Sequence, residues 1–136
     1  MGLLSRLRDR LSRKDEPALE IDSPGLVVVA EAFDIAEADS AVLARSPGLR
    51  TAEPAVLRHH LTLPPDQVER ARELLAPDGW TLVPGEVPGE VSHALRVQVL
   101  SALSCAQERS RMAGLAQRLG GDWIGWDALQ VPHGSG

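Results

Sequence analysis

Residues 55–83, AVLRHHLTLPPDQVERARELLAPDGWTLV, contain the clearest structural pattern of the chain. From 55 to 63 apolar and polar residues alternate, which places Leu57, His59 and Leu61 on one face of a β-strand. Pro64 and Pro65 end this strand and open a helix, because proline is well tolerated in a first helical turn. The segment therefore predicts a strand, a helix and a second strand.

A similar order follows in the second half of the chain. Residues 94–103 alternate as a third strand, and Ser104 begins a capping-box pattern that predicts the start of a helix. Gly120 marks the end of that helix, and residues 122–131 form a last strand. With right-handed crossovers, this order predicts an α+β fold, a ferredoxin-like βαββαβ sandwich over residues 55–131.

The residues before this unit can be interpreted in two ways. Over 25–46, the valines at 27–29 favour a strand that is followed by a helix from about residue 35 to residue 45. One continuous helix is the alternative, because alanine, glutamate and leucine dominate the second half. We expect the strand and helix to join a single domain over 25–131, followed by a short tail at 132–136.

The last strand holds two of the three tryptophans of the chain. Trp123 and Trp126 lie an odd number of residues apart, which predicts that they point to opposite faces of the sheet. Gly125 between them indicates a bulge or a close backbone approach. Packing explains both side chains, and an exposed Trp126 that anchors an interface is the alternative.

Few residues suggest catalysis or the binding of a metal or cofactor. His59 and His60 diverge as neighbours on a strand, so they cannot both bind one metal ion unaided. We expect His59 to be a hydrogen-bonded core residue, His60 to lie on the polar face, and Cys105 to be a small buried hydrophobe. The chain carries no phosphate-binding loop and no catalytic or metal motif, so we predict no catalytic residue, cofactor or metal. An enzyme that uses His59 or His60 is the remaining alternative.

Charge is distributed unevenly. The net charge is −5, but residues 1–14 hold five basic residues and one acidic residue, whereas the rest holds 9 basic and 18 acidic residues. An acidic body argues against direct nucleic-acid binding and favours a basic protein partner. Our candidate interface combines four acids of the densest acidic run with His60 and Trp126; the acids are Glu31, Asp34, Glu37 and Asp39.

The first 14 residues have the pattern of a short basic amphipathic helix. Residues 1–14 place leucines on one helical face and arginines around it, and we expect a frayed, solvated terminus. Weak contact with an anionic membrane surface or a partner is the alternative, and residues 15–24 read as a linker. No apolar stretch is long enough to span a membrane, and the single cysteine fits a reducing compartment, so we expect a cytoplasmic protein.

Two segments carry a family resemblance. LRHHLTLPPDQVERARELLAPDGWTLV (57–83) and RVQVLSALSCAQERSRMAGLAQRLGGDWIGWDAL (96–129) are similar to the RraB-type protein regulators of ribonuclease E. The shared features are a strand with His-His before an apolar residue, a helix that closes on Gly-aromatic at Gly79, and a last strand with aromatic-x-Gly-Trp at 123–126. Residues 1–54 do not match that pattern.

The resemblance implies a function as well as a fold. It implies a ferredoxin-like, non-catalytic protein that binds a ribonuclease E/G-type endoribonuclease and inhibits it, and so modulates RNA decay. The alternative that the residues leave open is a ferredoxin-like homodimer that binds a small molecule on its open sheet face.

Overall fold

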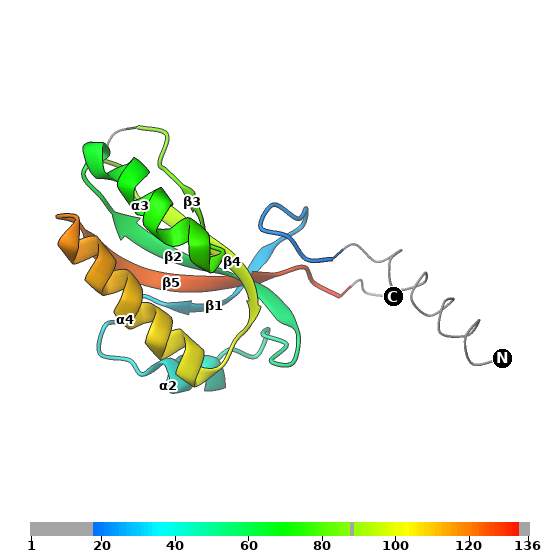
Figure 1. Cartoon of the computed structure of the whole chain (residues 1–136). Coiled ribbons are helices and arrows are strands. Elements are labelled where there is room, and N and C mark those ends of the chain that lie inside the picture. The colour runs from blue at the N-terminus through cyan, green and yellow to red at the C-terminus, as the bar shows by residue number, and fades with distance from the viewer. Residues whose placement is uncertain (1–17, 88, 134–136) are drawn as a thin grey trace.

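The computed structural model describes residues 18–87 and 89–133. It contains one five-stranded antiparallel sheet with three helices packed on it (Figure 1). Short 3-10 turns, Pro65–Gln67 and Ala76–Asp78, flank the second helix. The elements are β1 (Val27–Ala32), α2 (Asp39–Ala44), β2 (Pro54–Thr62), α3 (Val68–Leu75), β3 (Thr81–Val83), β4 (Ser92–Val99), α4 (Ala102–Arg118) and β5 (Asp122–Gln130).

The strand order confirms the predicted fold. The strands lie in the order β1-β5-β2-β4-β3, and every neighbouring pair is antiparallel. From β2 onward, the chain follows the ferredoxin-like βαββαβ order, and β1 extends the sheet beyond β5. The basic segment at 1–14, with weak membrane contact as its alternative role, lies outside the described residues.

The region 25–46 is a strand followed by a helix, as expected, but the helix begins later than residue 35. It begins at Asp39, because residues 34–37 form a turn instead. In this turn the Asp34 carboxylate accepts a hydrogen bond from the Ala36 backbone N–H at 2.9 Å. Aspartate stabilises turns in this way, at the expense of the first helical turn.

The start of α4 also differs by three residues from our expectation. The N-cap is Ser101 rather than Ser104, and the two serines form a reciprocal capping box. The Ser101 hydroxyl accepts from the Ser104 backbone N–H at 3.0 Å, and the Ser104 hydroxyl accepts from the Ser101 N–H at 3.2 Å. The predicted helix end is confirmed, since Gly120 has a left-handed φ of 86°.

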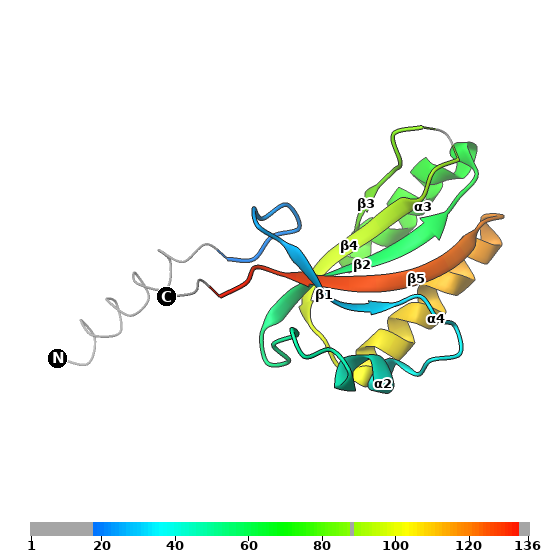
Figure 2. The same cartoon turned by 180° about the vertical axis from the view of Figure 1, so that it is seen from behind.

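The main core lies between the helices and one face of the sheet. Cys105, Met112 and Leu115 of α4 pack there on Leu57 of β2, and all four are buried. Figure 2 shows the opposite face, with the strands in front of the helices; no helix of the described residues lies on it. We call this second face the open face.

The two tryptophans of β5 correct one prediction. Trp123 and Trp126 both point toward the helices, not to opposite faces. The reason is a β-bulge, because His60 pairs with Gly125 but Leu61 pairs with Trp123. Ile124 is therefore an extra residue, and it turns Trp123 to the same face of the sheet as Trp126. The bulge that Gly125 indicated is therefore present, but its effect on side-chain direction was missed.

The turn between α4 and β5 makes a close contact that can be tested. A Cβ atom on Gly121 would lie 1.8 Å from the Thr62 backbone oxygen, whereas a Cβ on Gly114 within α4 would meet nothing within 4 Å. We expect Gly121→Ala to lower the free energy of unfolding by about 2 kcal/mol or more. The matched Gly114→Ala should raise it by about 0.5–1 kcal/mol, because alanine favours helix. Urea unfolding of both variants would measure this; equal effects would contradict the close approach.

Candidate functional site

The open face is the candidate site, and its side chains form three rows across the strands. One end carries a histidine row, the middle a charged row and the other end an apolar row. Each row follows from strand register, because side chains paired across antiparallel neighbours share a face.

The histidine row consists of Phe33, His60, His93 and Val83. His60 pairs with His93, and His93 pairs with Val83. The His60 ring lies edge-on to both of its neighbours, with centroids 5.0 Å from Phe33 and 4.5 Å from His93. Gly125 is required beside this row, because a Cβ there would lie 2.4 Å from the Phe33 ring.

Hydrogen bonds link the histidine row to the charged row. His60 Nε2 lies 2.9 Å from Asp127 Oδ1, and His60 Nδ1 lies 3.1 Å from His93 Nε2. Because an ionised carboxylate only accepts, His60 Nε2–H donates to Asp127. Burial, together with the nearby charges of His60 and Arg58, lowers the pKa of His93. Asp127, His60 and His93 are thus joined by two consecutive hydrogen bonds.

The charged row centres on the ion pair of Arg58 with Asp127. The guanidinium donates two hydrogen bonds to the carboxylate, at 2.8 and 2.6 Å. Burial by itself raises the pKa of Asp127, but the hydrogen bonds from His60 and Arg58 outweigh it and hold that pKa below its usual value. Glu31 of β1 pairs with Asp127 and is exposed, so the row as a whole is acidic.

The apolar row consists of Val28, Leu129, Val56 and Val97, which pair across the four strands from β1 to β4. Val56 and Leu129 are buried, but Val28 is 46% exposed. Val99, two residues beyond Val97 on the same strand, is 51% exposed. Such apolar exposure on one face beside an acidic row suits the docking of an apolar and basic surface.

The six predicted interface residues do not form one surface. His60 and Glu31 lie on the open face, and Asp34 is exposed just beyond β1. Glu37 is ion-paired with Arg45, whose guanidinium approaches to 2.6 Å. Asp39 and Trp126 are buried on the helix side, where the indole N–H donates to the carboxylate at 3.0 Å. These last two residues therefore contribute to the core rather than to an exposed surface.

Two other candidate residues, His59 and Cys105, lie in the core. His59 is fully buried, as expected, and burial lowers its pKa to about 3, with smaller contributions from His60, Arg96 and Arg109. Cys105 is buried as well, and burial raises its thiol pKa to about 12, which disfavours a nucleophilic thiolate. At neutral pH the His59 ring is therefore uncharged and the Cys105 thiol is protonated.

Beyond the open face, the described residues offer no further site, and the chain has no recognised relative. Within residues 18–87 and 89–133, no group of three or more histidine, cysteine, aspartate or glutamate residues could hold a metal ion. No helix of the same residues is long and apolar enough to cross a bilayer. The chain matches no protein-family model, and no curated protein or solved structure gives a significant match. The similarity to RraB-type regulators therefore rests on the segments quoted above.

Proposed function

We propose that this protein is a non-enzymatic, cytoplasmic regulator that binds a ribonuclease E/G-type endoribonuclease through its open face and inhibits it. The observation that carries the proposal is the exposed, partly apolar and acidic open face, which no helix of the described residues covers. The partner class comes from the resemblance of residues 57–83 and 96–129 to RraB-type regulators.

The polar groups of the open face favour protein binding over catalysis. Arg58, Asp127 and His60 already satisfy one another through hydrogen bonds of 2.6–2.9 Å. A partner can cover such a group without leaving a buried charge unpaired. The binding free energy would then come from apolar contact at Val28, Val99 and Val83, which are 46%, 51% and 45% exposed, respectively.

Charge selects the kind of partner. Glu31 and Asp34 lie on or beside the open face and are exposed, in a chain whose residues after 14 include 18 acids and 9 bases. Such a surface attracts a basic segment and speeds its association at low salt. Because basic segments of an endoribonuclease also hold RNA, their occupation by this protein would compete with the substrate.

Binding to a purified endoribonuclease of this class tests the proposal. Val28→Glu with Val99→Glu places two charges on the open face at exposed positions, and we expect binding to weaken at least tenfold. The matched control is Leu74→Glu with Leu103→Glu, at helix positions that are 36% and 68% exposed, and it should bind like wild type. Glu31→Lys should weaken binding at low salt and have less effect at high salt.

Other results would overturn the proposal. A tagged protein that recovers no such endoribonuclease from a native lysate, at low and at high salt, would contradict stable binding. If the protein instead forms a dimer that the Val28 and Val99 substitutions dissociate, the open face binds a second copy. Saturable binding of a small molecule to the same face would favour the alternative ligand-binding function.

A further inference from the structure

Two histidines of the open face present a ring nitrogen to each other. His60 of β2 and His93 of β4 are direct partners in the antiparallel register, so their side chains share a face although 33 residues separate them in the chain. His60 Nδ1 lies 3.1 Å from His93 Nε2, and the two ring planes are 89° apart. Both strands are interior strands of the sheet, with a paired neighbour on each side. The two rings therefore start from well-fixed backbone positions.

The separation of the two nitrogens is close to that of two ligands of one metal ion. In a tetrahedral zinc site the Zn–N bonds are about 2.0–2.1 Å long, which puts two bound nitrogens about 3.3–3.4 Å apart. The observed 3.1 Å is about 0.2–0.3 Å shorter than this spacing. At present the two nitrogens share one proton in a hydrogen bond. A metal ion would replace that proton after a small rotation that turns both lone pairs toward a common point.

The other nitrogen of His60 already has the partner that a metal-binding histidine usually has. His60 Nε2–H donates to Asp127 Oδ1 at 2.9 Å, and in the neutral ring this leaves the lone pair on Nδ1. A carboxylate behind the ring fixes its orientation and makes it a more basic ligand. Asp127 is held in turn by two hydrogen bonds from Arg58, at 2.8 and 2.6 Å. The ligand atom of His60 is therefore oriented before any metal binds.

The surroundings leave room for the remaining ligands of a metal ion. No helix of the described residues covers the open face, and Phe33 and Val83, which flank the pair in the histidine row, are each 45% exposed. Within residues 18–87 and 89–133 no third side chain completes a metal-binding group, so water would fill the other positions. The charge of Arg58 opposes a cation, but its ion pair with Asp127 offsets this charge.

We propose that His60 Nδ1 and His93 Nε2 form a two-histidine site for a divalent transition-metal ion of the zinc class, and that Asp127 positions His60 for it. Imidazole suits Zn²⁺, Ni²⁺ and Cu²⁺, whereas Mg²⁺ and Ca²⁺ require oxygen ligands. With two protein ligands instead of four, we expect a dissociation constant in the micromolar range, weaker than that of a structural zinc site. The site goes beyond the proposed function and does not depend on it, because metal binding needs no partner protein.

The test is a titration of the whole chain with zinc chloride at about pH 7.5, where a free imidazole is mainly neutral. The readout is the ¹⁵N signals of the histidine rings. We expect His60 Nδ1 and His93 Nε2 to shift together, in a saturable way and with the same midpoint, and magnesium chloride to shift neither. The proposal is overturned if zinc shifts the ring signals of only one of the two residues, or of neither at millimolar concentration.

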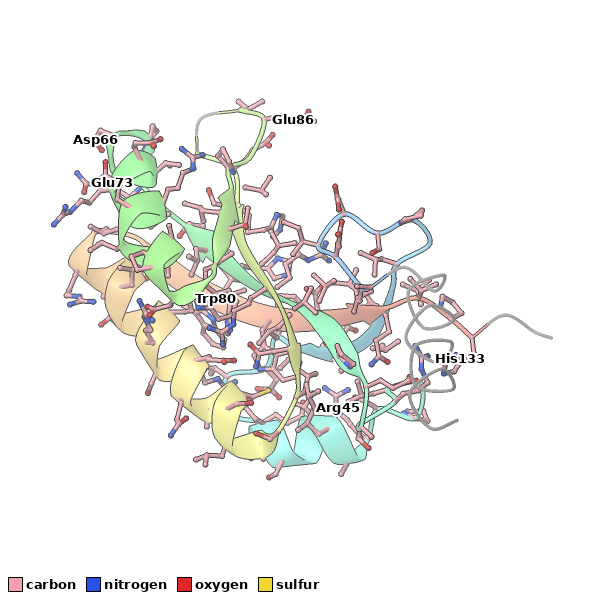
Figure 3. All side chains as sticks on the ribbon, turned by 45° about the vertical axis from the view of Figure 1, so that its right-hand side comes forward. Arg45, Asp66, Glu73, Trp80, Glu86 and His133 are labelled. Carbon is pink, nitrogen blue, oxygen red and sulfur yellow. The ribbon has the colours of Figure 1, made fainter. Side chains whose placement is uncertain are left out.

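Two variants locate the binding. His93→Gln removes one ligand and should weaken zinc binding at least tenfold, and its backbone amide spectrum shows whether it still folds. His133→Asn is the matched control, since His133 is 68% exposed and Figure 3 shows it where the chain leaves the sheet after β5, well apart from Glu86, which follows β3. Its titration should match wild type. Equal zinc affinity of His93→Gln and wild type, or loss of binding in His133→Asn, would show that the ion binds elsewhere.

Discussion

The protein is expected to lose stability steadily as the pH falls from about 6.5 to about 3, because of His59. Burial lowers the pKa of this residue to about 3 in the folded state, while an unfolded histidine titrates near its ordinary value of about 6.5. Between these values the unfolded chain binds a proton that the folded chain does not, so acid favours unfolding. Each pH unit costs about 1.4 kcal/mol, on the order of 4 kcal/mol in all by pH 3. Above pH 6.5 neither state binds this proton, and the effect vanishes.

Urea unfolding at a series of pH values measures this slope. His59→Phe removes the titrating group and should flatten the slope between pH 4 and 6.5, even though it also removes the Trp123 hydrogen bond and lowers stability at every pH. Leu103→Ala, at a position that is 68% exposed and does not titrate, is the control, and its slope should match that of wild type. His93, whose pKa burial also lowers, contributes in the same direction. An unaltered slope in His59→Phe would show that His59 is not buried as a neutral ring.

Trp126→Ala is expected to lower the free energy of unfolding by about 4 kcal/mol. The side chain is 0% exposed, and truncating a buried tryptophan leaves a large cavity. The substitution also removes the indole N–H that donates to Asp39 at 3.0 Å, so a buried carboxylate loses a hydrogen bond.

Chemical unfolding at pH 7 would measure the effect against two references. Trp126→Phe keeps most of the packing and should cost about 1–2 kcal/mol, mainly through the lost hydrogen bond. Ile124→Ala, at the 39% exposed extra residue of the bulge, should cost less than about 1 kcal/mol. Similar losses at residues 124 and 126 would contradict the inward orientation of Trp126.

The order of strands and helices was predictable because it depends on local patterns. The alternation at 55–63 and the proline pair after it identify β2 and the start of the next helical segment without knowledge of any partner. Helix starts were less predictable. The turn at Asp34 and the two serines at 101 and 104 offer competing local hydrogen bonds, and the sequence alone does not show which of them forms.

The direction of the Trp123 side chain depends on how β5 pairs with β2, a strand distant in the sequence. The bulge exists only where β5 pairs with β2, and it places Ile124 out of register. Gly125 gave a signal for the bulge, but counting residues between the tryptophans assumed a regular strand. A single extra residue reverses that count, because the side-chain period of a strand is two.

The open-face site was only partly predictable. The alternation of residues along β2 is enough to predict that His60 and Arg58 share the polar face. That His93 and Asp127 lie beside them depends on the register of β2 with β4 and β5, which the sequence does not reveal. The acids of residues 31–39 were grouped by charge density. The structure separates them, because Asp39 accepts from the buried Trp126 and Glu37 pairs with Arg45. Charge density alone does not reveal which acids have partners.

Methyl NMR of the chain with and without a ribonuclease E/G-type endoribonuclease would show whether the open face makes the contact. If it does, methyl signals of Val28, Val83 and Val99 should shift or broaden on addition of the enzyme. Those of Leu74 and Leu103, which are exposed on the helix side, should not change. Changes confined to the two leucines, or no change in either group at saturating enzyme, would contradict the account.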